Sequence, residues 1–292
     1  MASSSNITQV LETGSKKMSV GDYDEIYKFS CDLVKRVGAE IVAASRVREK
    51  LYETKSSAID FVTETDGRVE KLLMDAIAKR YPDHVLIGEE SAVEGKHQEL
   101  TDAPTWIVDP IDGTMNFVHS FPCSAISLAL WANKTAEVGL VYNPTENKLY
   151  SARRGGGAFL NGDPIHVSGT KELSQALVMF EVGTSRDPAK LRCVASNFAA
   201  LHPRIHGFRS LGSAALDMCM VAQGGADAYY EYGLHSWDMA AGVLIVREAG
   251  GYVCDTTGAD FDLLSRRVLC AANSELASQM SPMLAHVDLP RD

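Results

Sequence analysis

Two short apolar runs in this sequence end directly in acidic residues, and this pairing strongly limits the folds open to the chain. The run at 85–87 is followed by Glu89 and Glu90, and the run at 106–108 is followed by Asp109. Short runs of this kind are typical of strands that are buried on both faces. Because α/β proteins assemble their sites where strands end at a sheet edge, we expect a layered α/β fold with carboxylates gathered at such an edge.

The rest of the chain alternates predicted helices and strands. Ser19 and Asp22 resemble a capping box ahead of a long amphipathic helix, and a second helix follows the strand-like segment 60–63 and ends at Pro82. The first predicted strands after 106–108 form an antiparallel meander, and the mixture as a whole predicts mixed sheets layered with helices. The further predicted strands are 126–130, 137–142, 148–153, 177–182, 205–208, 226–231, 252–254 and 268–272, and the further predicted helices are 188–200, 214–222, 238–249 and one that begins at Ser274.

No internal repeat or low-complexity linker marks a domain boundary. Residues 1–18 are polar and rich in serine, so we expect a loose tail there. Residues 19–292 are expected to form a single domain of two closely packed α/β halves, at about 19–183 and 184–292. The glycines at 155–157 could cradle a phosphate, but no Lys-Ser/Thr pair follows them, which favours a hairpin turn.

The composition narrows the class of partner. Asp plus Glu total 38 against 28 for Lys plus Arg, a formal net charge of −10, so a nucleic acid polymer is not an expected partner. The longest apolar stretches fall short of the ~20 residues that a membrane-spanning helix needs, and no secretory signal is recognisable. We therefore expect a soluble, cytoplasmic protein whose six cysteines are reduced thiols.

The densest group of polar side chains lies at 106–117. Asp109 and Asp112 flank a Pro-Ile pair at a predicted strand end, and Gly113 and Thr114 follow where a helix could begin. Taken alone, this segment could be an ordinary turn with Asp112 as a helix cap.

Two further acids favour a metal site instead. Glu89 follows the preceding predicted strand, and Asp238 opens a predicted helix far downstream. Carboxylates that converge in this way would raise one another's pKa values unless cations lay among them. With the Thr114 hydroxyl and the Ile111 carbonyl they form the hard oxygen donor set that suits Mg²⁺. Backbone N–H groups near Gly113 would bind an anion, so the sequence predicts a metal site that faces a phosphate.

Four motifs in this order resemble the inositol monophosphatase family. The segment 106–119 (WIVDPIDGTMNFVH) resembles the first signature of that family, and 237–242 (WDMAAG) resembles its second. The segments 88–90 (GEE) and 60–66 (DFVTETD) also occur where the family has them. The resemblance implies an αβαβα sandwich with mixed sheets, two or three Mg²⁺ ions per active site, sensitivity to lithium and a homodimer.

The resemblance also implies roles for individual residues. A first metal would be held by Glu89, Asp109, the Ile111 carbonyl and Thr114, and a second by Asp109, Asp112 and Asp238. Asp66 would be associated with a third, weaker metal and with the nucleophilic water, and Lys55 with a mobile loop beside the site.

The same resemblance separates catalytic from substrate-binding positions. Glu89, Thr114 and Asp66 would be catalytic because they orient the attacking water. A carboxylate at Glu231 would accept hydrogen bonds from the hydroxyls of a small phosphorylated polyol. The positions expected to contact substrate are Asp112, Gly113, Thr114, Thr184, Ala214, Glu231 and Asp238.

These features predict a Mg²⁺-dependent phosphomonoesterase that hydrolyses myo-inositol monophosphates to inositol and phosphate by a metal-activated water. Metal coordination can lower the pKa of water from about 15.7 to about 7. A covalent phosphoenzyme is not expected, because the sequence has no Cys-x5-Arg, Asp-x-Asp-x-Thr/Val or Gly-x-Ser-x-Gly motif. The alternatives are a related phosphatase for fructose bisphosphate, histidinol phosphate or 3'-phosphoadenosine 5'-phosphate, and a non-catalytic metal-binding scaffold.

Overall fold

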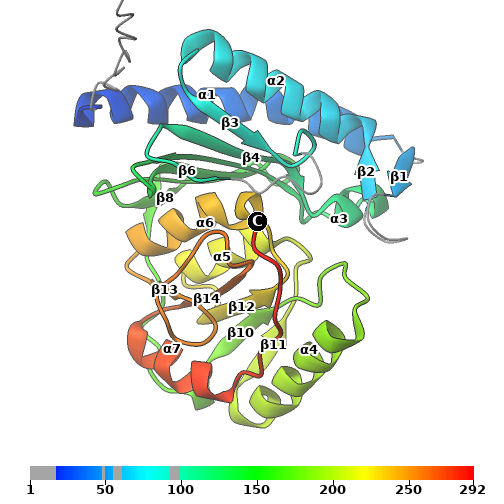
Figure 1. Cartoon of the computed structure of the whole chain (residues 1–292), viewed down its shortest axis with the longest axis vertical. Coiled ribbons are helices and arrows are strands. Elements are labelled where there is room, and N and C mark those ends of the chain that lie inside the picture. Colours follow the sequence, from blue (N-terminus) through cyan, green and yellow to red (C-terminus); the bar gives the residue numbers. More distant parts are fainter. Residues whose placement is uncertain (1–17, 48–49, 55–60, 93–98) are drawn as a thin grey trace, which may run out of the picture.

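Helices and sheets alternate in five layers, from α1 and α2 at one end to α4 and α7 at the other (Figure 1). The structure is a computed structural model that describes residues 18–47, 50–54, 61–92 and 99–292. The expected tail therefore lies outside the described residues except for residue 18, and so does Lys55. The order helix, sheet, helix, sheet, helix confirms the predicted αβαβα sandwich.

The first layer is made of α1 (Val20–Ser45) and α2 (Glu64–Arg80), which cover the outer face of the larger sheet. The predicted capping box is present, since Ser19 accepts from the Asp22 amide and Asp22 accepts from the Ser19 amide. Below them lies a sheet in the order β3-β4-β5-β6-β7-β8-β9, in which β3 and β4 are parallel and every later pair is antiparallel. Its strands are β3 (Val85–Gly88), β4 (Thr105–Asp112), β5 (Ala125–Ala132), β6 (Thr135–Asn143), β7 (Lys148–Arg153), β8 (Ala158–Leu160) and β9 (Asp163–Ile165).

The glycines at 155–157 form the turn between β7 and β8, as predicted. The amides of Gly155 and Gly157 donate to the two carboxylate oxygens of Glu248, each over 2.8 Å. This turn does bind an anion, but the anion is the chain's own side chain at the end of α6, so the glycines have a structural role.

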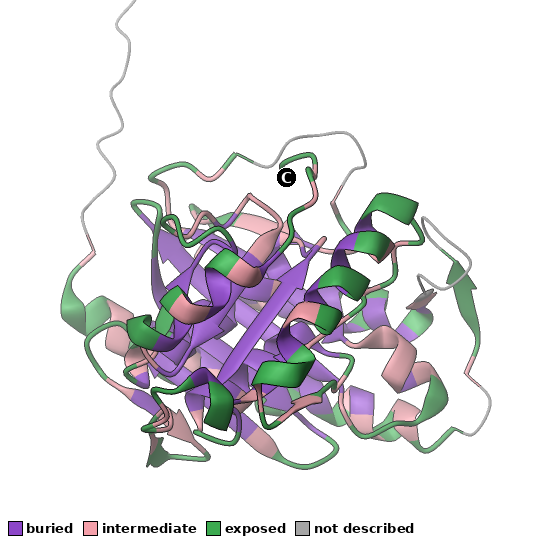
Figure 2. Cartoon of the chain, turned by 90° about the horizontal axis from the view of Figure 1, so that it is seen from below, coloured by how far each residue is buried: buried purple, intermediate pink, exposed green. Residues whose placement is uncertain are grey.

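The middle layer is deeply buried, and Figure 2 shows that buried residues fill the interior of the molecule. It contains α5 (Ala214–Ala222) and α6 (Ser236–Glu248), which pack between the two sheets and bury nearly all their residues. At Gly139 in β6, an added Cβ would lie 2.7 Å from the Ala241 carbonyl oxygen. A glycine is needed there because helix α6 approaches the sheet backbone so closely.

The smaller sheet has the order β11-β10-β12-β14-β13 and is covered on its outer face by α4 (Pro188–Leu201) and α7 (Ser274–Met280). β10 is parallel to β11 and β12, whereas β12, β14 and β13 are antiparallel. The chain passes from the larger sheet to the smaller one between Ile165, the end of β9, and Leu177, the start of β10. This crossing lies before the predicted division at about 184. The strands are β10 (Leu177–Phe180), β11 (Gly207–Arg209), β12 (Ala228–Tyr232), β13 (Tyr252–Cys254) and β14 (Arg267–Ala271).

Three short elements complete the fold next to α2. They are β1 (Tyr52–Thr54), β2 (Phe61–Thr63) and α3 (Thr114–His119), which begins directly after β4. Among the described helices, none is both long and apolar enough to cross a membrane.

Candidate active site

A bulge at the end of β4 brings Asp109 and Asp112 together. Asp109 lies opposite Ser127 and Asp112 lies opposite Ala125, so β4 has one residue more than β5 over this stretch. In a regular strand, residues three apart point to opposite faces, and an extra residue removes that difference. The bulge therefore explains how two acids with this spacing can point to the same side.

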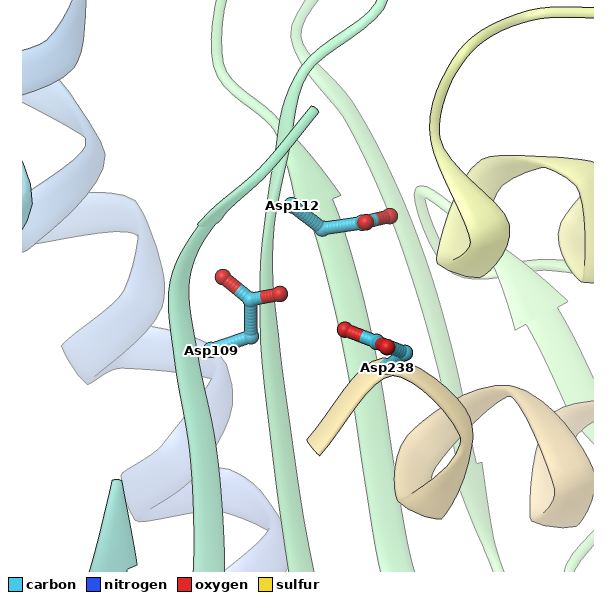
Figure 3. Close-up of side chains that lie close together, drawn as sticks. All are labelled: Asp109, Asp112 and Asp238. Atoms are coloured by element: carbon cyan, nitrogen blue, oxygen red, sulfur yellow. The ribbon is translucent and has the colours of Figure 1, made fainter. Parts of the chain in front are cut away.

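Asp238, in the first turn of α6, completes the group. One oxygen of each carboxylate of Asp109, Asp112 and Asp238 lies within 4.8 Å of the others. Figure 3 shows the three side chains converging from β4 and α6 on a shared space. The structure thus brings together three of the predicted metal ligands.

Each of these carboxylates is fixed by a donor from the chain itself. The Ile111 amide donates to Asp109 Oδ1 over 2.9 Å, and the His235 amide donates to Asp238 Oδ2 over 2.7 Å. Asp112 Oδ2 accepts from the Ser213 hydroxyl and, over 2.8 Å, from the amide of Ala215 in the first turn of α5. The three side chains are therefore held in place by neutral donors, which do not balance their charge.

The charges of the site are unbalanced without a cation. Burial raises the pKa of Asp109 well above its usual range, and the nearby carboxylates of Glu89, Asp112 and Asp238 raise it further. Burial also raises the pKa of Asp112 to about 6, although its hydrogen bonds oppose the shift. The pKa of Asp238 is raised by burial and then by Asp112. A set of carboxylate oxygens in this state fits a hard divalent cation, which would allow all three acids to ionise.

Glu89 lies directly after β3 and is close enough to contribute to the raised pKa values of all three aspartates. The next residue is held by Glu70 of α2, whose Oε2 accepts from the Glu90 amide over 2.8 Å. Glu70 is 5% exposed and lies so close to Gly88 that any Cβ there would overlap it. Sequence reasoning missed Glu70; the available signal was an acid next to Val69 in the apolar stripe of α2.

Thr114 connects Asp66 to the Ile111 carbonyl. Its hydroxyl lies 3.2 Å from Asp66 Oδ1 and 3.0 Å from the Ile111 oxygen, and one hydroxyl has a single hydrogen to donate. Asp66 itself is fully buried and accepts from the amide and hydroxyl of Thr63, which caps α2. A cation on the Ile111 carbonyl would leave the Thr114 hydrogen to Asp66.

A second group of charged side chains lies next to the aspartates. Glu231, at the end of β12, accepts from the Tyr229 hydroxyl and is 5% exposed. Burial raises its pKa to about 8, while the positive charge of Lys190 opposes the shift. Lys190 of α4 is 3% exposed, and burial lowers its pKa. Lys190 could not be recognised from the sequence, because a lysine near the start of an amphipathic helix ordinarily faces water.

The remaining predicted contact residues surround these two groups. Gly113 has φ +87°, and a Cβ there would lie 2.8 Å from the Cys123 oxygen and 3.0 Å from the Gly212 oxygen. Ala214 begins α5 beside the amide that holds Asp112. Thr184 is exposed in the loop after β10, and its neighbour Gly183 lies against Glu231 and Lys190.

Comparison with known proteins shows the family of the chain. Residues 22–287 match the model of the Inositol monophosphatase family. The chain is 46% identical over 271 residues to human Inositol monophosphatase 1, covering 92% of this chain and 98% of that protein. It is 45% identical over 276 residues to human Inositol monophosphatase 2, covering 94% of this chain and 96% of that protein.

A comparison with solved structures gives the same family. A solved structure of the Thermotoga maritima IMPase superposes with a TM-score of 0.79 at 32% identity, covering 89% of this chain and 96% of that one. The acids at the end of β4 and the start of α6, the five-layered fold and these matches lead to one conclusion: the chain belongs to the inositol monophosphatase family.

Proposed function

We propose that this protein is a Mg²⁺-dependent phosphatase that hydrolyses myo-inositol monophosphates to inositol and phosphate. The observation that carries the proposal is the convergence of the Asp109, Asp112 and Asp238 oxygens within 4.8 Å. The curated relatives at 45–46% identity are named inositol monophosphatases, which supports the same activity for this chain.

In this proposal, Glu89, Asp109, the Ile111 carbonyl and Thr114 would hold a first Mg²⁺, and Asp109, Asp112 and Asp238 would hold a second. Bound Mg²⁺ would supply the positive charge that binds phosphate and that lowers the pKa of an attacking water. Glu89 and Thr114 orient that water. With a cation on the Ile111 carbonyl, Asp66 would accept the single hydrogen of Thr114 and so fix the direction of its hydroxyl.

The charge of the chain makes such cations necessary. The formal net charge is −10, and each of the aspartates in the cluster would repel a phosphate. Substrate could approach these acids only after cations had reversed the local sign. We propose two Mg²⁺ ions per active site with a third, weaker one near Asp66.

The polyol would lie beside the second group, next to Glu231 and Lys190. A carboxyl with a pKa near 8 is mainly protonated at neutral pH, so Glu231 can both donate to and accept from a ring hydroxyl. Lys190 offers a further donor. The other proposed substrate contacts are Asp112, Gly113, Thr114, Thr184, Ala214 and Asp238.

The test is a phosphate-release screen over inositol, sugar and nucleotide monophosphates, with and without Mg²⁺. We expect Mg²⁺-dependent release that is fastest with inositol monophosphates. Faster turnover of fructose bisphosphate or histidinol phosphate would reassign the substrate. Nucleotides are included because a crystal structure of SaIMPase-II, 27% identical to this chain, is described as 2'AMP bound. No release from any ester would leave only a metal-binding scaffold.

Four further properties belong to the proposal: inhibition by lithium, cytoplasmic location, a homodimer and a single domain. Inhibition by Li⁺ is supported by a structure of Staphylococcal inositol monophosphatase-1, 25% identical, described as a LiCl soaked inhibitory complex. We also propose a cytoplasmic homodimer in which residues 19–292 of each chain form one domain. Light scattering on the purified protein would measure the oligomeric state.

A further inference from the structure

The C-terminal end of the chain lies near α6 (Figure 1), and the buried side chain of Asp292 contacts the first turn of that helix. This side chain is 5% exposed. Its Oδ1 lies 2.7 Å from His235 Nδ1 and 3.6 Å from Arg266 Nε, and its Oδ2 accepts from the Ser236 amide over 2.8 Å. Neither the sequence motifs nor the proposed reaction gives this carboxylate a role.

The partners of His235 define its protonation. Arg266 Nη2 lies 3.1 Å from Nε2, and a guanidinium can only donate, so Nε2 accepts. The hydrogen is therefore on Nδ1 and is donated to Asp292. The ring also stacks on Trp237, with centroids 4.6 Å apart. Both ring nitrogens are in use, so His235 is fixed in place and has no nitrogen available for a metal.

His235 in turn holds a proposed metal ligand. Its backbone amide donates to Asp238 Oδ2 over 2.7 Å. Ser236 is the first residue of α6, and its amide is one of the N–H groups that a helix leaves without a partner in its own backbone. Asp292 supplies the missing acceptor, together with a negative charge at the positive end of the helix. The Asp292 carboxylate thus fixes His235 and Ser236, the two residues that come just before Trp237 and Asp238.

We propose that Asp292 is a positioning residue of the metal site, which holds His235 and Ser236 so that the Asp238 carboxylate faces Asp109 and Asp112. The proposal rests on the proposed function in so far as it treats Asp238 as a metal ligand. A carboxylate suits this position because it accepts from two donors that point at it from different directions, one a ring N–H and one a backbone N–H. Outer partners of metal ligands commonly change metal affinity by about 10–100-fold when they are removed.

The experiment measures metal binding without substrate. Asp292→Asn keeps the shape of the side chain but replaces one acceptor oxygen with an amide NH₂, which must face one of the two donors. Titrating Mn²⁺ and following the electron paramagnetic resonance signal of the free ion, we expect the Kd to rise about tenfold. The Mg²⁺ concentration for half-maximal activity should rise in parallel, while kcat at saturating Mg²⁺ stays within threefold of the parent.

Arg291→Ala provides the matched control. It removes an exposed ion pair with Asp262 from the residue next to Asp292 without touching α6. We expect the Mn²⁺ affinity of this variant to equal that of the parent. A tenfold loss in Arg291→Ala as well would overturn the proposal, because general loosening of this segment would then explain both effects.

A purely structural role for Asp292 predicts a different result. In that case Asp292→Asn would lower the Tm of the metal-free protein and leave the Mn²⁺ Kd within twofold of the parent, which would overturn the proposal. If Asp292→Asn does not fold, Asp292→Glu decides: a longer arm with both oxygens should bind Mn²⁺ about threefold more weakly. A Kd equal to the parent's would then reject the role. Failure of the proposed function would be seen separately, as a parent that binds Mn²⁺ but releases no phosphate.

Discussion

Two groups of buried acids lie side by side in this molecule and differ in how their charge is balanced. The first, Asp109, Asp112 and Asp238, is held by neutral donors, and the charged groups that act on it most strongly are other carboxylates. The second contains Glu231, which lies beside Lys190, and Asp217, whose pKa the Glu231 carboxylate helps to raise. The first group therefore needs cations from solution, whereas the second can be neutralised by protons and a lysine. This difference suits the first to bind a phosphate through metals and the second to bind a neutral polyol.

The largest expected effect is that of Asp109→Asn in the first group. Its carboxylate is expected to contact both metals, so the amide removes charge at both positions together. We expect kcat for inositol monophosphate to fall by about 100-fold or more, measured as phosphate release at saturating Mg²⁺. Asp255→Asn is a control, because Asp255 is buried in an ion pair with Arg267 outside the site. A variant of Asp109 that keeps more than a tenth of the parental kcat would contradict the metal assignment.

The second effect is on stability in the absence of metal. The folded-state pKa of Asp112 is raised to about 6 from its ordinary 3.8, so the folded protein holds a proton that the unfolded chain has released. The contribution of this proton to the free energy of unfolding is therefore complete below pH 3.8. It is lost as the pH rises to about 6, and the loss is roughly 3 kcal/mol at most. Glu231 extends the loss to about pH 8.

Calorimetry in the presence of EDTA measures this loss. The Tm should fall by several degrees between pH 5 and pH 8, and Mg²⁺ at pH 8 should restore it, because binding to the folded state alone adds stability. A Tm that is independent of pH, or that Mg²⁺ leaves unchanged, would show that the first group is already balanced within the chain.

The sequence predicted some features of the fold and the site but could not predict others. Asp109, Glu89 and Asp238 could be identified because Asp109 and Glu89 follow short apolar runs and Asp238 lies in the first turn of a helix with a readable pattern. The bulge in β4 could not be predicted, because it depends on how β4 pairs with β5. The hydrogen bond from Ser213 to Asp112 could not be predicted either, because it joins residues 101 positions apart. The strands β8 and β9, with three residues each, were too short to show a period.

The third effect concerns the choice of substrate. Glu231→Gln resembles the protonated form of Glu231, so its cost should be small at pH 6.5 and should grow as the parent ionises near pH 8. We expect kcat/KM for inositol monophosphate to fall about tenfold at pH 9, since a charge-assisted hydrogen bond contributes about 1.5–3 kcal/mol. A small phosphate ester without ring hydroxyls serves as the control and should be hydrolysed as by the parent. Equal losses on both substrates would place Glu231 in support of the metal site instead.

The smallest effect on metal binding is expected at Asp217 of α5, the second acid of the second group. It is fully buried, and its two carboxylate oxygens have no donor among the residues that the structure describes, although the carboxyl of Glu181 lies close enough to share a hydrogen with it. Burial raises its pKa well above the usual range, and the carboxylate of Glu181 raises it further. Glu181 Oε1 accepts from the Gly212 amide over 2.6 Å, and Oε2 accepts from the Ser210 hydroxyl over 2.8 Å. Asp217 is therefore expected to be protonated in the folded protein.

Asp217→Asn replaces a protonated carboxyl by an amide of nearly the same shape, so below pH 3.8, where the unfolded parent is protonated as well, the free energy of unfolding should change by less than about 0.5 kcal/mol. The sign should depend on pH. The parent keeps a proton in the folded state that its unfolded chain has lost, so its stability falls as the pH rises, and the amide is free of that loss. The Tm of the variant should therefore exceed that of the parent increasingly between pH 6 and pH 9, while its Mn²⁺ affinity stays the same. A large, pH-independent loss of stability would instead mean that Asp217 is ionised and paired, and the contrast between the two acid groups would then disappear.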